Sequence, residues 1–276
     1  MPFDSATQFA RDIVHYREPL ISLASKEFKV WYRNAALGFV WSVLNPLLLM
    51  VVLTFVFRFL VGWRQAVSPH PFPVFVLCGL IPWTFLSRSV TRSTGSLIDN
   101  ASLIQKVYFP REIIPLSTVL ACLLNFVLSL VVLVVFVMAF GYMPSLWVAF
   151  VPVIVLALLL FIMGVALAAS CLNVFYRDVA HFIETLLLLW WWGTPIFYSH
   201  EMAYSELVEQ RGWSFFYHLY MANPMAGVVV SLRQILLDRR CPDLDIVATL
   251  YVAGIVSLLV GWTIFRRTQS VLADFV

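Results

Sequence analysis

The sequence predicts an all-α integral membrane protein with six transmembrane helices. Of its 276 residues, 62% are hydrophobic and only 12% are charged, whereas soluble domains are about 45–50% apolar and about 25% charged. The mean hydropathy is +0.90. The apolar residues gather in runs long enough to cross a bilayer, and this pattern, more than the averages, indicates the class.

The first 34 residues form a predicted cytoplasmic and interface region, and residues 35–276 a single transmembrane domain. The segment PLISLASKEFKVWYRNA, residues 19–35, is amphipathic at helical spacing. Its polar side carries Lys26, Lys29 and Arg33, and its apolar side carries Ile21, Ala24, Phe28, Trp31, Tyr32 and Ala35. A basic face opposite an aromatic-rich face is typical of a helix in the membrane interface. The alternative is a soluble helix packed on a partner.

The predicted spans follow from length, because about 20 mostly apolar residues cross a bilayer core as a helix. Six runs meet this requirement, at about 35–57, 72–91, 113–142, 146–176, 179–198 and 246–265. Only the turn MPS separates the third run from the fourth, so these two are expected to form an antiparallel hairpin.

The positive charges indicate the orientation of the chain. With six spans and a cytosolic N-terminus, 12 of the 18 Lys and Arg residues fall inside and 6 fall outside. Lys and Arg are enriched in cytoplasmic segments of membrane proteins. The N- and C-termini are therefore expected in the cytoplasm.

Residues 213–232 are 20 uncharged residues that are long enough for a seventh span. A seventh span would change the charge distribution to 13 against 5, so charge does not exclude it. The centre of the segment reads MANPMAG, and Asn-Pro between small residues is a turn signal. We expect a re-entrant hairpin on the outer side, whose irregular backbone must be buried in protein or line a wet cavity.

The loop between the second and third spans contains a short amphipathic helix. Asp99 or Asn100 can cap it and Pro110 ends it. Its apolar ridge consists of Leu103, Ile104, Val107 and Tyr108. The spacing fits two interpretations equally well: the ridge docks into a partner, or it rests on this protein's own bundle or on lipid headgroups.

The known catalytic motifs are absent from the sequence. None of the 11 glycines is followed by lysine, so there is no G-x-x-x-x-G-K-[ST] loop to hold ATP phosphates. No H-E-x-x-H motif or metal-ligand spacing occurs, and a formal charge of +3 does not suggest nucleic acid. We therefore expect no catalytic residue, cofactor site or metal site. The middles of the spans also lack the ionisable residues typical of ion-coupled transporters, so energy for transport is expected from a partner subunit.

Several blocks resemble one family across residues 20 to 267. RNAALGFVWSVLNPLLLMVVLTFVF, GLIPWTFLSRSVTRSTGSLIDNASLIQKVYFPREIIPLSTVLACLLN, NVFYRDVAHFIETLLLLWWWGTPIFY and NPMAGVVVSLRQILL, in this order, resemble the permease subunits of bacterial ATP-binding-cassette exporters for O-antigen polysaccharide and wall teichoic acid.

The resemblance implies a homodimer in the bacterial cytoplasmic (inner) membrane, with a channel lined by the first and fifth spans. It also implies two copies of a nucleotide-binding ATPase subunit, docked on the loop at 96–112, which hold the ATP and magnesium. The ridge would then be a coupling helix. The resemblance favours the re-entrant hairpin over a seventh span and matches the N-terminal interface helix.

Aromatic residues are the candidates for the channel and its outer gate. Trp190, Trp191 and Trp192 are consecutive, so on a helix they point in different directions and cannot all face the same side. The one that faces the channel suits the C–H faces of sugars. The residues around the predicted hairpin are the gate candidates: Tyr198, Phe215, Phe216, Tyr217 and Tyr220. Membrane-interface belts are the alternative role for most of these aromatics.

The resulting expectation is the channel-forming subunit of an ATP-driven exporter for lipid-linked polysaccharide, in contact with membrane lipids. Two alternatives stay open: a permease of similar shape for capsule precursors or drugs, and a membrane scaffold that transports nothing.

Overall fold

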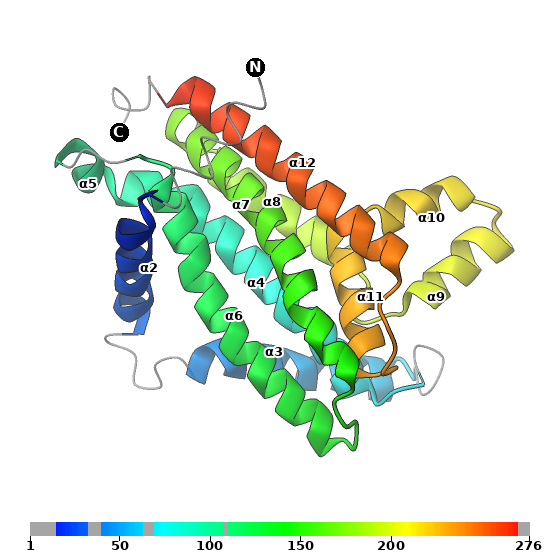
Figure 1. The fold of residues 1–276 in the computed structure, drawn as a ribbon. Helices are drawn as coiled ribbons and strands as arrows, with labels where there is room; N and C mark the ends of the chain where they lie inside the picture. Colours follow the sequence, from blue (N-terminus) through cyan, green and yellow to red (C-terminus); the bar gives the residue numbers. More distant parts are fainter. Residues whose placement is uncertain (1–14, 33–39, 63–68, 107–109, 270–276) are drawn as a thin grey trace.

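The computed structural model describes residues 15–32, 40–62, 69–106 and 110–269, and all regular structure within these ranges is helical. Figure 1 shows the helices in chain order. They are α2 (Arg17–Tyr32), α3 (Val40–Thr54) with a π-helical continuation (Phe55–Leu60), α4 (Phe72–Asp99), α5 (Ala101–Lys106), α6 (Ile113–Ala139), a short 3-10 segment (Leu146–Phe150), α7 (Val151–Phe175), α8 (Val179–Trp192), α9 (His200–Tyr204) with a π-helical continuation (Ser205–Gln210), α10 (Ser214–Met221), α11 (Pro224–Leu236) and α12 (Leu244–Thr268).

Among the described residues, five helices are long and apolar enough to cross a membrane. They are Val40–Leu60, Phe72–Asp99, Ile113–Ala139, Leu146–Phe175 and Leu244–Thr268, and they coincide with five of the six predicted spans. The predicted span 179–198 is helical only as α8, which has 14 residues. Gly193 and Pro195 follow directly, and proline cannot continue the hydrogen-bond ladder of a helix. The total of six spans stays a prediction.

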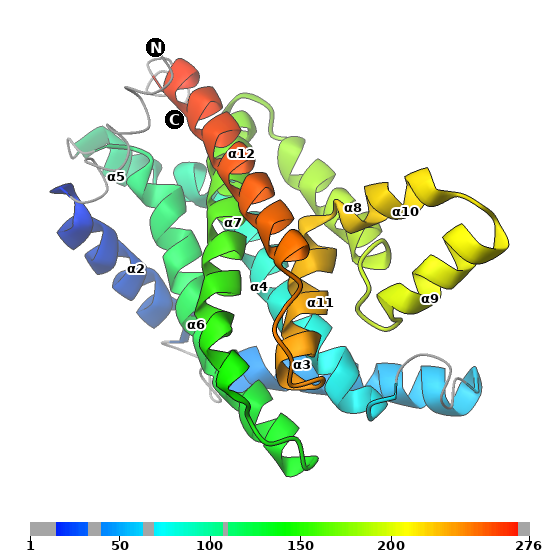
Figure 2. The same cartoon turned by 45° about the vertical axis from the view of Figure 1, so that its right-hand side comes forward.

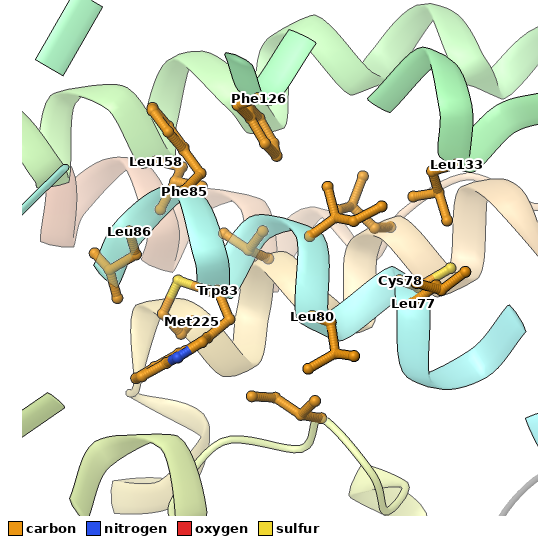
Figure 3. Packing of buried hydrophobic residues seen from close by; sticks show 14 of the residues in the cluster. Leu77, Cys78, Leu80, Trp83, Phe85, Leu86, Phe126, Leu133, Leu158 and Met225 are labelled. Carbon is orange, nitrogen blue, oxygen red and sulfur yellow. The ribbon is translucent and has the colours of Figure 1, made fainter. Parts of the chain in front are cut away.

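The core of the bundle is built around α4. In the most apolar 18-residue window of α4, 78% of the residues are buried. In the corresponding window of α12 the share is 17%. Figure 3 shows α4 side chains meeting Phe126 and Leu133 of α6, Leu158 of α7 and Met225 of α11. Phe85 of α4 stacks on Phe126 with ring centroids 4.5 Å apart. Every other long helix is therefore positioned by its contact with α4 or with a neighbour of α4.

α7 and α12 pack backbone to backbone, as Figure 2 shows from the side. A methyl group on Gly254 would lie 2.9 Å from the carbonyl oxygen of Ala157, and one on Gly261 would overlap the backbone of Gly164. Small residues allow such close approach between membrane helices, where van der Waals packing drives association. The opposite face of α12 is exposed and apolar, including Val252, Ile255, Val256, Leu259 and Val260.

The two ends of the bundle are distinct. One end gathers the start of α2, the end of α4, the start of α6 and the end of α12, through a cluster that includes Leu20, Leu97, Ile113 and Phe265. At the other end, His70 before α4 meets Tyr142 after α6, 3.1 Å from the phenol oxygen. The described helices thus begin and end on the same side of the bundle, with the start of α2 and the end of α12 in one cluster.

α2 is amphipathic, and one stripe of it packs on the bundle, while the interface position predicted for its apolar face stays a prediction. Leu20 and Ala24 are buried against α6, whereas Ile21 is 59% exposed. Lys26 and Lys29 point outward. Leu20, Ala24 and Trp31 share one helical stripe, and packing on α6 selects that stripe over the neighbouring one containing Ile21. Residues 33–39 lie outside the described ranges, so Arg33 and Ala35 are not placed.

α3 lies across the other long helices rather than along them (Figures 1 and 2). It contacts α4 and α6 through one face that includes Pro46 and Leu47. Only 22% of its most apolar window is buried.

Candidate functional site

α8 ends halfway through the bundle, and the chain continues without helical structure. Trp190, in the last turn of α8, packs edge-on against Trp83 in α4 and Phe161 in α7, with centroids 6.0 and 5.9 Å away. A 14-residue helix is about 21 Å long, which is short of the hydrocarbon core of about 30 Å. Residues 193–199 continue beside α4, where a methyl group on Gly79 would lie 3.0 Å from the Cα of Ile196.

Asn223 closes the upper part of this irregular segment. Its side-chain oxygen accepts hydrogen bonds from the Trp190 indole N–H (2.8 Å) and from the backbone N–H of Met225 (3.0 Å). Its amide nitrogen donates to the carbonyl of Gly193 (3.3 Å) and to the hydroxyl of Thr194 (3.2 Å). Asn223 therefore caps the start of α11 and ties it to the end of α8.

Arg233 closes the lower part. Arg233 is only 6% exposed. Its guanidinium donates hydrogen bonds to the backbone carbonyls of Phe75 (3.2 and 3.3 Å), Ile196 (2.7 Å) and Tyr198 (3.3 Å). The same group lies 3.3 Å from the centroid of the Phe75 ring. Backbone carbonyls that are not in a helix need partners inside a membrane protein. Arg233 supplies them for the segment after α8.

The predicted turn inside residues 213–232 is present. α10 ends at Met221, and α11 begins at Pro224 after the Asn223 cap. α11 then runs alongside α4. Its residue Met225 lies near Trp83 of α4, and its residue Arg233 lies near Phe75, one helix end further on. The outer re-entrant topology of the whole segment stays a prediction.

The three tryptophans of α8 have three different environments. Trp190 is partly buried, with its indole N–H bonded to Asn223 and its ring against Trp83 and Phe161. Trp191 is partly buried, with its ring 5.4 Å from that of Phe197. Trp192 is 56% exposed. The structure therefore identifies Trp192 as the tryptophan that is free to face a channel or lipid, and Trp190 as a packing residue.

The five gate candidates divide into two groups. Tyr198, Tyr217 and Tyr220 come together, with centroid distances of 6.4 Å from Tyr198 to Tyr220 and 6.3 Å from Tyr220 to Tyr217. Phe215 and Phe216 lie on α10 and are 71% and 54% exposed. α9 and α10 project sideways from the bundle (Figures 1 and 2). The tyrosines line the base of this projection, and the phenylalanines form an apolar surface on it.

A polar pocket of about 400 Å³ lies where this projection joins the bundle, lined by residues that include His70, His200, Arg233 and Asp238. His70 lies 2.7 Å from a carboxylate oxygen of Asp238. Burial lowers the pKa of His200 below its ordinary value. These residues tie the start of α4 to the end of α11.

The two described members of the predicted ridge, Leu103 and Ile104, are both partly buried. α5 extends beyond the end of α4, away from the main bundle (Figures 1 and 2). Ile104 packs against the protein's own cluster around Leu97 and Ile113, and Leu103 is partly buried. Val107 and Tyr108 lie outside the described residues. The carbonyl of Asn100 accepts the first backbone bonds of α5, while its side chain donates back to Ser96 at 2.9 Å.

The exposed apolar faces of α3 and α8 are candidate surfaces for a channel or a subunit contact. Leu187 is the only buried residue of α8. Both helices pack on α4, and the ring of Phe57, after α3, stacks at 5.0 Å on Phe197, after α8. Their exposed large side chains include Trp41, Leu48, Leu49, Val51, Val52, Phe55, Phe59, Leu60, Phe182, Leu186, Leu188, Leu189 and Trp192.

Sequence reasoning missed the roles of Asn223 and Arg233. Asn223 entered only as a turn signal, and Arg233 only as a charge on the outer side. The available signal was a cation directly after a 20-residue uncharged run, because a charge in such a place needs partners. The partners themselves are as many as 158 residues away, beyond any local pattern.

Comparison with known proteins adds independent information. Residues 18–237 match the model of a family described as ABC-2 type transporter. The chain is 35% identical over 267 residues to the O-antigen export system permease protein RfbA of Myxococcus xanthus, covering 97% of this chain and 98% of that protein. It is 34% identical to an RfbA protein of Klebsiella pneumoniae, covering 92% and 93%. It is 22% identical to the polysialic acid transport protein KpsM of Escherichia coli, covering 90% and 93%.

Proposed function

The chain belongs to the ABC-2 type transporter family, and we propose that it is the channel-forming membrane subunit of an exporter that moves lipid-linked polysaccharide out across the cytoplasmic membrane. The observation that carries this proposal is the similarity to O-antigen export permeases along 97% of the chain. A similarity of this extent covers the spans, the loop that contains α5, and the α8–α11 junction, which is the segment from Val179 to Leu236 that Asn223 and Arg233 hold together.

The channel is formed by two copies of the chain, through the exposed faces of α3 and α8. A polymer of sugars needs a polar or aromatic path, since bare hydrocarbon would remove hydrogen bonds from each hydroxyl. Trp192 is exposed on α8, and its ring face and N–H suit sugar C–H groups and hydroxyls. Trp191 flanks it, with ring centroids 4.9 Å apart. Tyr198, Tyr217 and Tyr220 act as the outer gate.

Energy comes from a separate ATPase, two copies of which hold ATP and magnesium and dock on α5. The chain contains no phosphate-binding loop of the G-x-x-x-x-G-K-[ST] type, so the purified chain alone is expected to show no ATP turnover. Because Ile104 packs inward, Leu103 is the described member of the ridge that docks into the ATPase. Val107 and Tyr108 complete the ridge in this proposal.

In this proposal, α5 and both termini lie in the cytoplasm of a bacterium. The end of the bundle that carries α5 also carries Arg111, whose guanidinium donates to the carbonyl of Gln269 at 2.5 Å. Arg177, Arg266 and Arg267 also lie at helix ends on this side. An excess of Arg and Lys supports a cytoplasmic position for this end.

A capsule-type polysaccharide is the second candidate cargo, and the similarity to KpsM over 90% of the chain favours it over a drug. A deletion strain tests all alternatives. Without this gene, lipid-linked polymer is expected to accumulate inside the cell and to disappear from the surface, and a plasmid copy should reverse both effects. Normal surface polysaccharide with altered drug resistance would instead indicate a drug permease. No change in either would indicate a scaffold.

A further inference from the structure

His200 lies where the projection formed by α9 and α10, residues 200–221, joins the bundle (Figures 1 and 2). It is the first residue of α9, and it lines the polar pocket of about 400 Å³ together with Ser199, Arg233 and Asp238. The pocket is partly open, so water reaches the imidazole. The chain just before His200 is held to the bundle, because the carbonyl of Tyr198 accepts a hydrogen bond from Arg233 at 3.3 Å. His200 therefore stands at the point where a fixed segment becomes the projection.

The two helices of the projection hold each other and meet the bundle at their base. The ring of Tyr204 in α9 packs on the ring of Tyr217 in α10, with 5.1 Å between centroids. At the base, Tyr220 of α10 meets Tyr198 with a centroid distance of 6.4 Å, and α10 contacts α11. A displacement of the start of α9 would therefore be passed to α10 through the Tyr204–Tyr217 contact.

The surroundings of His200 keep its imidazole neutral at pH 7. Burial is the main cause of its lowered pKa. Glu201, the next residue, acts in the opposite direction, but it is exposed to water, which screens its charge. Arg233 of α11 adds to the effect of burial. No hydrogen bond to the His200 ring occurs among the described residues, so a charged ring would find no acceptor in place.

The other charged groups around the pocket compensate one another. Asp243 and Arg240 act on His200 in opposite directions, and their side chains lie 3.5 Å apart. His70 and Asp238, which also line the pocket, are paired at 2.7 Å. A proton taken up by His200 therefore adds positive charge to a pocket that already holds a buried guanidinium.

We propose that His200 is a pH-sensitive attachment of the projection: when its ring is protonated, the start of α9 leaves the pocket and the projection loosens. A released His200 lies in water and binds a proton at its ordinary pKa, whereas the docked residue binds the proton less well. As pH falls below the ordinary pKa, the released form therefore gains stability relative to the docked form. The gain levels off once pH has passed the lowered pKa of the docked form. Above pH 7 neither form is protonated, and the docked form is favoured.

The consequence for transport rests on the proposed function, in which Tyr198, Tyr217 and Tyr220 act as the outer gate. Acid on the outer side would separate Tyr220 from Tyr198 and so weaken the gate. The attachment itself does not depend on the cargo or on the ATPase, because the residues that form it all belong to this chain.

The test is hydrogen exchange followed by mass spectrometry on the purified full-length chain in detergent, with protection factors corrected for the intrinsic pH dependence of exchange. Between about pH 7.5 and about pH 5, the wild-type amides of residues 200–221 should lose protection roughly threefold or more, while those of α4 stay unchanged. H200Q and H200N are neutral at both pH values and should keep the protection that wild type has at the higher pH. H200K is charged at both values and should be loose at both.

His218 provides the matched control, because it is an exposed histidine on α10 of the same projection. H218Q should therefore show the same fall in protection as wild type, and thermal unfolding at the higher pH checks that each variant is folded. An unchanged fall in the two neutral variants, or loss of the fall in H218Q, would overturn the proposal. Low protection in both neutral variants at both pH values would overturn it too, since His200 would then hold the projection by its shape and not by its charge. None of these outcomes involves export, so they are separate from the deletion experiment that tests the proposed function.

Discussion

Replacing Arg233 by methionine is expected to destabilise the protein strongly. Methionine has a similar length but no donors, so the carbonyls of Phe75, Ile196 and Tyr198 would all lose the bonds that they accept from Arg233. Each unsatisfied buried polar group costs about 1–3 kcal/mol. Methionine also removes the cost of burying a cation, which offsets several kcal/mol. We therefore expect a net loss of about 3 kcal/mol in the free energy of unfolding.

The measurement is thermal unfolding in detergent, followed by tryptophan fluorescence. A loss of about 3 kcal/mol corresponds to a decrease in Tm of roughly 6–12 °C. Arg233→Lys keeps the charge but reaches fewer carbonyls, so its Tm should lie between those of wild type and R233M. Hydrogen exchange adds a local readout, because the amides of residues 193–199 should lose protection first.

Arg240 provides the matched control. It is also an arginine at this end of the bundle, but its side chain is 52% exposed and its ion pairs with Asp238 and Asp243 are 3.8 and 3.5 Å long. Exposed pairs of this kind contribute about 0–1 kcal/mol, so R240M should change Tm by no more than a few degrees. If R233M and R240M had the same Tm, the guanidinium would not be what holds the segment after α8.

Three further predictions follow from the geometry. Trp192→Ala should reduce polysaccharide export with an unchanged Tm, whereas Trp190→Ala should lower the Tm by several degrees; the reverse order in paired export and unfolding assays would remove Trp192 from the channel. Leu103→Asp should abolish co-purification of the ATPase while membrane insertion stays normal, because a charge would meet an apolar contact, and Ser102→Ala should have no effect; normal co-purification in both would mean that α5 rests on lipid. Gly261→Ala should lower the free energy of unfolding by about 1–3 kcal/mol, because the added methyl group forces α12 away from the backbone of α7; an unchanged Tm would show that the helix pair tolerates separation.

Much of the structure of the α8–α11 junction could not be predicted from the sequence. The span at 179–198 was predicted as one helix because its residues are apolar, and apolarity does not distinguish a helix from a buried extended segment. The irregular segment after α8 is held by Asn223 and Arg233, which bond its backbone. The stripe of α2 that packs on the bundle was likewise not readable from the sequence, since Ile21 and Leu20 are equally apolar and only contact with α6 selects between them.

The sequence by itself determined the membrane class, five of the long helices, the turn at Asn223 and the family. These depend on composition, on the length of apolar runs and on local turn chemistry, all of which act within a few residues. The tertiary structure decided which tryptophan bonds to Asn223 and which is exposed, which ridge residue packs on the protein's own cluster and what holds the chain after α8. Helical spacing gives the angles between side chains on one helix, but the rotation of that helix against its neighbours depends on contacts from distant parts of the chain, such as those of Trp190 with Trp83 and Asn223.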